Sequence, residues 1–309
     1  MGRRVILPVS IAVATLGAFV IVALETSNGA VAAATTPSWS LLVAAFAVTA
    51  GVQPLRALAW RSTLRQPVGF RAIYASSAVG SFLDTVLPWR AGEASKVAAL
   101  RVAAGRSWPG FGRAAGSLIC AHLLEAIAFA LVGAVSAFFL PFPDWARGTL
   151  VGALGLAGGG LILAAALHHK IGRFLPGGLD RFLAGAAAPP KVMLRALVVL
   201  LATWTARWGG IFLMLHAFGV PASAGAALVY MIVTGLANTA PLLPGNAGVY
   251  QGAAVGALAL VGQAGSNAVA VSLAAPVVAS IGTAIAALVG IALYGRRFTE
   301  IPRAAFARV

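Results

Sequence analysis

The stretch FLDTVLPWRAGEASK, Phe82–Lys96, places two acids and two bases inside a chain that is otherwise strongly apolar. It also contains Pro88 and Gly92, which interrupt an apolar region between residues 72 and 104. Proline removes a backbone donor and glycine loosens the chain, so we expect two half-helices here rather than one continuous helix. Whether this interrupted region crosses a membrane or turns back determines the topology of the whole chain.

The composition indicates an integral membrane protein. Of the 309 residues, 60% are hydrophobic and only 9% are charged, whereas soluble domains carry roughly 25% charged residues. The net charge of +15 does not indicate nucleic-acid binding, because the basic residues form short clusters between apolar segments. Such clusters are typical of cytoplasmic loops beside anionic lipid. A single cysteine, Cys120, excludes an intrachain disulfide and a cysteine-based metal site.

Apolar segments of about 20 residues are long enough to cross a bilayer as helices. Six segments qualify, near residues 5–24, 39–60, 113–140, 148–167, 194–218 and 267–294. We expect the first to be an uncleaved span, because its apolar stretch exceeds the roughly 7–15 residues of a signal-peptide core. A second interrupted apolar region, residues 222–263, contains Pro244, Gly245 and Gly248 near its middle.

The basic residues predict that both interrupted regions return to the side from which they entered. Cytoplasmic loops carry the excess of arginine and lysine, and six spans with two re-entrant hairpins place every basic cluster, and both termini, in the cytoplasm. The alternative, eight to ten ordinary spans, requires some loops to violate this rule. We therefore predict an all-α polytopic membrane protein with one transmembrane domain over residues 1–295 and a short basic cytoplasmic tail over residues 296–309.

The two hairpins resemble each other in sequence. LPWRAGEAS (Leu87–Ser95) and LPGNAGVYQ (Leu243–Gln251) share L-P-x-x-A-G at identical spacing. Two such loops entering from opposite faces are what an inverted-topology repeat produces, and such repeats bind substrate near the bilayer midplane. Irregular backbone at that depth is tolerated where it is buried in protein or lines a polar cavity. We therefore expect a central polar cavity.

Six charged residues are predicted at membrane depth. They are the acids Asp84, Glu93 and Glu125 and the bases Arg90, Lys96 and Arg207. Each costs roughly 2.5–3.5 kcal/mol on insertion scales, so such groups usually pair or line a pathway. Either they neutralise one another and hold the hairpin closed, or a surplus of cation binds an anionic ligand. For Lys96, extension to the cytoplasmic interface is a further alternative.

The expected roles of these side chains differ. Glu93 should open the second half-helix, where a carboxylate suits the positive end of the helix dipole. Arg90 lies in the interrupted loop, and its planar guanidinium matches a phosphate or carboxylate through two contacts. His122 and Glu125 lie three residues apart on one helical face. This spacing favours a buried polar clamp or a proton relay over a metal site, because no further ligands stand nearby; we expect no metal and no cofactor.

Together, the two loops resemble those of the lysylphosphatidylglycerol synthase transmembrane, or flippase-like, family, over nearly the whole chain. The family's first loop, P-x-R-x-G-E, is matched here by Pro88, Arg90, Gly92 and Glu93. The family often has E-R-x-x-D on a membrane helix between the loops. The corresponding residues here read AHLLE, with His122 in place of the arginine and Glu125 in place of the last acid.

The later loop departs further from the family pattern P-G-G-x-G-x-x-E. Pro244, Gly245 and Gly248 match, whereas Asn246 replaces a glycine and Gln251 replaces the glutamate. A role of that glutamate in proton or charge transfer is therefore not carried over to this chain.

The resemblance implies movement of an anionic or lipid-linked headgroup, such as an aminoacyl phospholipid or a polyprenyl-linked sugar, between leaflets. We expect Arg90, Arg207 and Lys96 to hold the headgroup, and we expect four further residues to position these cations or relay protons: Asp84, Glu93, Glu125 and His122. We expect no enzymatic activity, because the chain ends soon after its last span and has no room for the soluble aminoacyltransferase domain that some members carry.

Two other classes of function remain open. One is a secondary transporter of a small soluble anion through the same cavity, and the other is a non-catalytic scaffold for a glycosyltransferase or lipid-modifying enzyme. Expected partners are membrane lipids or a lipid-linked intermediate, such an enzyme, and a second copy of the chain, since 36 glycines allow close helix packing. No nucleic-acid partner is expected, and the expected location is the plasma or inner membrane.

Overall fold

The computed structural model describes residues 37–86, 91–139, 144–171, 177–238, 249–263 and 265–294, and all regular structure in these ranges is helical. The all-α class predicted from the sequence is thereby confirmed. Several predicted features lie outside the described residues: the span 5–24, the tail 296–309, Pro88, Arg90, Pro244, Gly245, Asn246 and Gly248.

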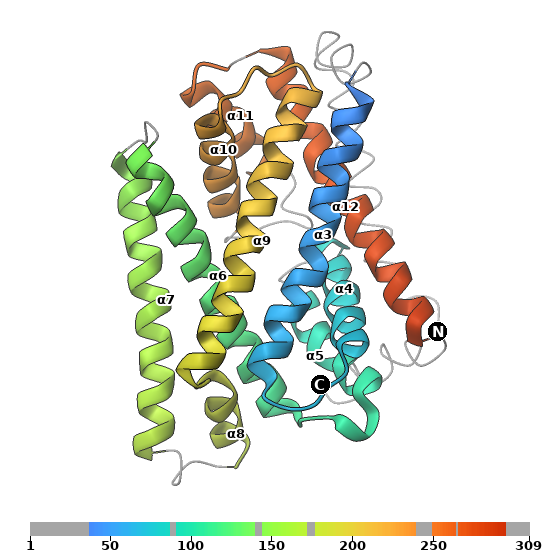
Figure 1. Ribbon diagram of the computed structural model, residues 1–309, viewed down its shortest axis with the longest axis vertical. Helices are drawn as coiled ribbons and strands as arrows, with labels where there is room; N and C mark the ends of the chain where they lie inside the picture. Colours follow the sequence, from blue (N-terminus) through green and yellow to red (C-terminus); the bar gives the residue numbers. More distant parts are fainter. Residues whose placement is uncertain are drawn as a thin grey trace. The chain divides into compact units, whose positions relative to one another are not determined.

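Within the described ranges, five helices are long and apolar enough to cross a membrane. They are α3 (Trp39–Leu64), α6 (Phe111–Phe139), α7 (Asp144–Ile171), α9 (Pro190–Ala217) and α12 (Ser266–Tyr294) (Figure 1). They coincide with five of the six predicted spans. Large apolar side chains on these helices are exposed, including Leu156 of α7 at 82% and Leu288 of α12 at 65%, as expected of helices that face lipid.

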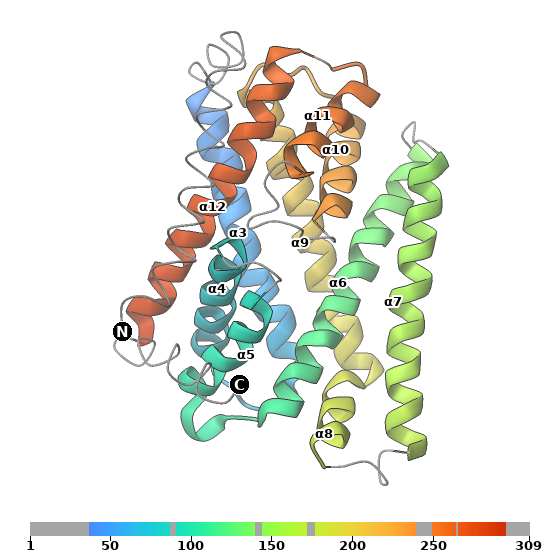
Figure 2. The same ribbon diagram turned by 180° about the vertical axis from the view of Figure 1, so that it is seen from behind.

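Each interrupted region forms two shorter helices, as predicted. The first region consists of α4 (Phe70–Val86) and α5 (Ala91–Ala104), and the second of α10 (Ala224–Ala237) and α11 (Val249–Leu260). The two helices of each pair lie side by side in both views (Figures 1 and 2). At about 1.5 Å per residue, none of the four reaches the roughly 30 Å thickness of the hydrocarbon core. That the pairs are re-entrant hairpins of opposite orientation stays a prediction.

The chain divides into two compact units. Unit 1 comprises the described residues within Met1–Ala50, Ser81–Glu93 and Arg207–Ala284, and unit 2 those within Gly51–Gly80, Ala94–Ala206 and Ile285–Val309. Five helices contribute residues to both units: α3, α4, α5, α9 and α12. The single transmembrane domain expected over residues 1–295 stays a prediction.

The core of unit 2 joins α3, α4, α5 and α6. Trp60, Ile73, Leu100 and Leu118 belong to one cluster of buried apolar side chains in which Ile73 and Leu100 are fully enclosed. A short 3₁₀ turn, Gly105–Ser107, leads from α5 toward α6. Because α4 and α5 bury apolar side chains in this cluster, packing stabilises two helices that would be marginal in isolation.

A tenth α-helix in the described chain, α8 (Gly177–Ala186), packs on α6 within unit 2. It buries Leu183, Gly185 and Ala186. A Cβ atom at Gly185 would lie 2.5 Å from the carbonyl oxygen of Arg113, and one at Gly116 would collide with the carbonyl oxygen of Phe182. These glycines allow the two backbones to approach closely, as small residues do between membrane helices.

In unit 1, α10 is almost entirely buried and packs on α11. The hydroxyl of Ser223 caps α10 by accepting a hydrogen bond from the backbone N–H of Ala226 at 3.1 Å. Before it, α9 ends at Ala217, and Gly219, two residues later, has a φ of 69° in the left-handed region that favours glycine. This turn leads the chain directly into the second interrupted region.

Candidate functional site

An ion pair connects α3 and α6 inside unit 2. Nη2 of Arg56 donates a hydrogen bond to Oε2 of Glu125 at 3.0 Å. The two side chains are 29% and 15% exposed, and both residues lie on helices long enough to span the membrane. Either charge without the other would be costly at such a position, so the pair ties the two helices together.

Two further side chains hold Glu125 in place. Nδ1 of His122, one turn earlier on α6, lies 3.5 Å from the same carboxylate oxygen. Nε1 of Trp204 on α9 donates a hydrogen bond to the backbone carbonyl of Glu125 at 3.1 Å. The Trp204 ring packs on Phe129 with ring centroids 4.7 Å apart. The His122–Glu125 pair thus forms part of a polar cluster, the Glu125 cluster (Arg56, His122, Glu125 and Trp204), which joins α6 to α3 and α9.

A second set of hydrogen bonds supports the same α3–α6 contact. Nε1 of Trp60 donates to the hydroxyl of Ser117 at 3.2 Å, and the hydroxyl of Thr63 donates to the Ser117 carbonyl at 3.0 Å. Trp60 lies one turn after Arg56 on α3. Buried polar groups that are fully bonded in this way fix one arrangement of the helices.

Arg56 is not among the site residues predicted from the sequence. The second span is predicted to end near residue 60, whereas α3 continues to Leu64, so Arg56 lies about two helical turns inside the helix. Glu125 is one of three acids predicted to position Arg90 and Arg207, and in the structure it pairs with Arg56. A signal was present, because an acid at membrane depth requires a counter-charge and Arg56 follows a purely apolar and polar-neutral stretch of the same span.

The charged residues of the first interrupted region lie on both of its helices. Asp84 is on α4 and half-buried, whereas Glu93 is half-buried in the first turn of α5, as predicted. Gly92 is buried beside it. Lys96 is 4% exposed, which argues against the alternative in which it extends to the membrane interface. Asp84, Glu93 and Lys96 each interact with other groups of the protein.

Unit 1 contains a second polar cluster, the hydroxyl cluster (Tyr230, Thr234 and Tyr250). The hydroxyls of Tyr230 and Tyr250 lie 3.3 Å apart, and the Thr234 hydroxyl donates to the Tyr230 carbonyl at 2.7 Å. The positive charge of Arg207 acts on both tyrosines.

Helix packing brings Arg207 to this cluster. Its neighbour Trp208 donates from Nε1 to the carbonyl oxygen of Ala224 at 2.9 Å, which joins α9 to the start of α10. Arg207 is half-buried, and Gln251 follows Tyr250 in the first turn of α11. Neither tyrosine is among the site residues predicted from the sequence, although Tyr230 and Thr234 lie one turn apart on one face of an otherwise apolar helix.

These features define the class of the protein: a multi-pass α-helical membrane protein that carries paired charges and bonded hydroxyls inside its spans. Among the residues that the structure describes, no three histidine, cysteine or acidic side chains are grouped to hold a metal ion. The model of the family described as lysylphosphatidylglycerol synthase TM region matches residues 5–299. The protein belongs to this family, as the two loops predicted. Comparisons with curated proteins and with solved structures found no match.

Proposed function

We propose that the protein moves an anionic or lipid-linked headgroup between the leaflets of its membrane, and that it acts as a transporter rather than an enzyme. Lys96, Arg207 and Arg90 are the cations that hold the headgroup, while the lipid tails stay in the bilayer. Membership of a family named for the membrane region of a lipid synthase supports a substrate of lipid origin.

The observation that carries the proposal is the Arg56–Glu125 pair at 3.0 Å. Because Arg56 engages Glu125, only two acids, Asp84 and Glu93, remain at the predicted membrane depth. They stand against three bases, Arg90, Lys96 and Arg207. The charge of this set is positive whichever groups pair within it. A net positive charge in hydrocarbon is costly, and an anionic headgroup compensates it. The pair thus favours the second of the two alternatives left open by the sequence.

The surroundings of Arg207 fit the same ligand. A guanidinium group binds a phosphate through parallel hydrogen bonds. The hydroxyls of Tyr230 and Tyr250, on which the charge of Arg207 acts, can donate or accept hydrogen bonds. A headgroup with a phosphate and an uncharged polar part, such as a sugar, would use both kinds of group.

Lipids retained by the purified full-length protein provide the test. Native mass spectrometry would compare the wild type with Lys96→Met and Arg207→Gln. We expect the wild type to enrich one anionic or lipid-linked species, and each substitution to reduce its retention roughly tenfold, the value of one charge-assisted hydrogen bond. Lys191→Met and Arg195→Gln are matched controls, because both side chains are exposed on α9, and they should retain the species.

Three outcomes would contradict the proposal. Equal retention of bulk lipid by all five proteins would remove headgroup binding. Uptake of a soluble anion into liposomes that depends on Lys96 and Arg207, without selective lipid retention, would identify a soluble-anion transporter. If Lys96→Met and Arg207→Gln change neither lipid retention nor anion uptake, and both variants support full activity of an associated lipid-modifying enzyme, the chain acts as a scaffold.

A further inference from the structure

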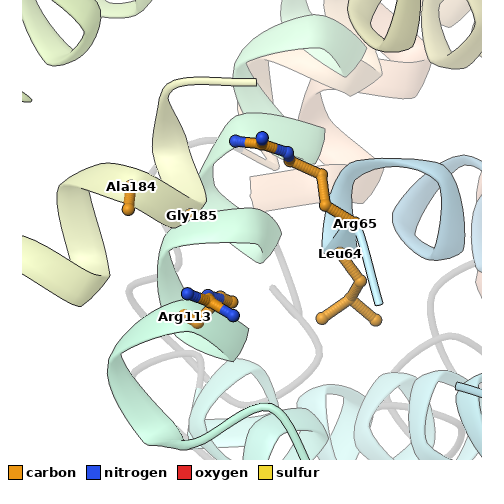
Figure 3. A pocket seen from close by; sticks show the side chains of 5 residues that line it. All are labelled: Leu64, Arg65, Arg113, Ala184 and Gly185. Atoms are coloured by element: carbon orange, nitrogen blue, oxygen red, sulfur yellow. The ribbon is translucent and has the colours of Figure 1, made fainter. Parts of the chain in front are cut away.

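A basic pocket lies at one end of unit 2, where α3 ends and α6 begins. Its volume is about 140 Å³, and it is lined by Leu64, Arg65, Arg113, Ala184 and Gly185 (Figure 3). None of these residues belongs to the set to which we assign headgroup transport. The pocket therefore requires a separate explanation.

Two arginines supply its polar surface. Arg65 is the first residue after α3 and is exposed, and its side chain extends toward α6 and α8 (Figure 3). Arg113 lies in the first turn of α6 and is half-buried. Within the part of the chain that the structure describes, neither guanidinium group forms a hydrogen bond or an ion pair. Two like charges that face one small pocket repel each other unless an anion lies between them.

The backbone is specialised on two sides of the pocket. Arg65 has a φ of 53° and is the single residue other than glycine with a positive φ among those described. A long side chain is disfavoured in this conformation, and such positions cluster at functional sites. On the other side, Gly185 lets the backbone of α8 lie so close to α6 that a Cβ atom at this position would be 2.5 Å from the carbonyl oxygen of Arg113. The close approach brings α8 against Arg113 and closes one wall of the pocket.

The location of the pocket favours a ligand from the membrane surface. Arg65 and Arg113 belong to basic clusters that the sequence predicts on the cytoplasmic side. Both residues lie at the ends of helices that are long enough to span the membrane. The ends of such helices lie at the depth of the lipid headgroups. The start of α6 adds the positive end of its helix dipole. All three contributions favour an anion with several oxygen atoms.

We propose that this pocket binds the phosphate group of an anionic phospholipid of the cytoplasmic leaflet. Arg65 and Arg113 hold the phosphate from two sides, and the acyl chains lie along the apolar outer surface of the spans. The site is distinct from the transport residues and keeps its ligand whether or not headgroup transport occurs. A water-soluble phosphate ester would offer the same phosphate chemistry, so the test must separate the two sources.

The full-length protein in phosphatidylcholine nanodiscs that contain phosphatidic acid is the system for the test, with bound phosphatidic acid counted by native mass spectrometry. Arg65→Asn keeps a residue that tolerates the left-handed conformation, and Arg113→Gln keeps the length of the side chain closely. We expect each substitution to weaken phosphatidic acid binding roughly tenfold and the double substitution to abolish it. Arg101→Gln is the matched control, since Arg101 is an exposed arginine in the last turn of α5.

Arg65→Gly distinguishes loss of binding from loss of folding. Glycine adopts a positive φ without strain, so this variant should unfold at the wild-type temperature or above it and still bind roughly tenfold more weakly. In a protein that also carries Lys96→Met and Arg207→Gln, the substitutions Arg65→Asn and Arg113→Gln should weaken phosphatidic acid binding by the same factor as in the wild-type background. That result distinguishes the pocket from the proposed transport function, which is tested separately by lipid retention in Lys96→Met and Arg207→Gln.

Glycerol phosphate added to the protein in detergent tests the soluble source. We expect it to compete with phosphatidic acid only weakly, because it lacks the acyl chains. If glycerol phosphate binds as tightly as the lipid and depends on the same two arginines, the lipid assignment is overturned in favour of a soluble phosphate ester. If Arg65→Asn and Arg113→Gln bind phosphatidic acid as well as Arg101→Gln does, the pocket is not a phosphate site.

Discussion

The Glu125 cluster in unit 2 and the hydroxyl cluster in unit 1 stabilise their buried polar groups in different ways. In unit 2, the Arg56 guanidinium and the Glu125 carboxylate meet at 3.0 Å, with His122 at 3.5 Å from the same oxygen. In unit 1, neutral hydroxyls of Tyr230 and Tyr250 meet at 3.3 Å beside the charge of Arg207. The first arrangement pairs two opposite charges in direct contact, whereas the second places two neutral hydroxyls within reach of a positive charge.

This difference indicates that the Glu125 cluster has a structural role and that the hydroxyl cluster is suited to binding a ligand. A closely matched ion pair is desolvated and has little left to offer a ligand, so its contribution is to hold α3 and α6 in one arrangement. Hydroxyls can exchange their partners without leaving a bare charge. A cation bordered by hydroxyls is therefore suited to a ligand that arrives and leaves.

The largest expected effect is on the ion pair. Glu125→Gln leaves Arg56 without its counter-charge, and we expect the free energy of unfolding to fall by about 3 kcal/mol, the lower end of the range for a broken buried pair. Equilibrium unfolding in a fixed lipid or detergent mixture measures it. The double variant Arg56→Met with Glu125→Met should lose clearly less than the sum of the two single changes. If the losses of the two single variants simply add, the two charges are not coupled, and the structural role assigned to the ion pair is wrong.

Arg207→Gln should separate function from stability. Because the charge of Arg207 acts on neutral hydroxyls, whereas Arg56 forms an ion pair with Glu125, we expect the free energy of unfolding to fall by about 1 kcal/mol, alongside the roughly tenfold loss of lipid retention described above. Arg56→Gln is the comparison and should show the opposite balance, with a larger loss of stability. Equal losses of stability in the two variants would mean that both arginines are structural.

Removing one hydroxyl tests whether the tyrosine contact contributes to folding. Tyr230→Phe removes the partner of the Tyr250 hydroxyl, and we expect a loss of about 1 kcal/mol in the free energy of unfolding. Tyr74→Phe is a matched control on α4, where the phenol makes no hydrogen bond within the described residues. A Tyr230→Phe protein as stable as the control would indicate that the two hydroxyls are only neighbours.

The smallest effect concerns Trp204. Trp204→Phe removes the hydrogen bond to the Glu125 carbonyl, at 3.1 Å, but keeps an aromatic ring against Phe129. We expect a loss of roughly 0.5 kcal/mol, the low end for one neutral hydrogen bond. Trp39→Phe, at a position that is 67% exposed, is the control. A loss several times larger would show that Trp204 positions the Glu125 carboxylate as well.

The features that could be predicted from the sequence are those set by local pattern. Apolar length gives the spans, and proline with glycine gives the ends of α4 and α10, because both depend only on neighbouring residues. Arg56 could not be assigned to Glu125 in this way, since 69 residues separate the two and only the packing of α3 on α6 brings them together. The Tyr230–Tyr250 contact likewise depends on how α10 packs on α11.

The glycine contact between α6 and α8 has a consequence for how the protein is made. The α8 helix follows α6 and α7 in the chain, so it can dock only after both have been synthesised and inserted. A single added methyl group at Gly116 would leave the earlier spans untouched while preventing this late docking. Such a defect would appear as a segment that stays open to proteases and to membrane quality control, in a protein whose spans are all in place.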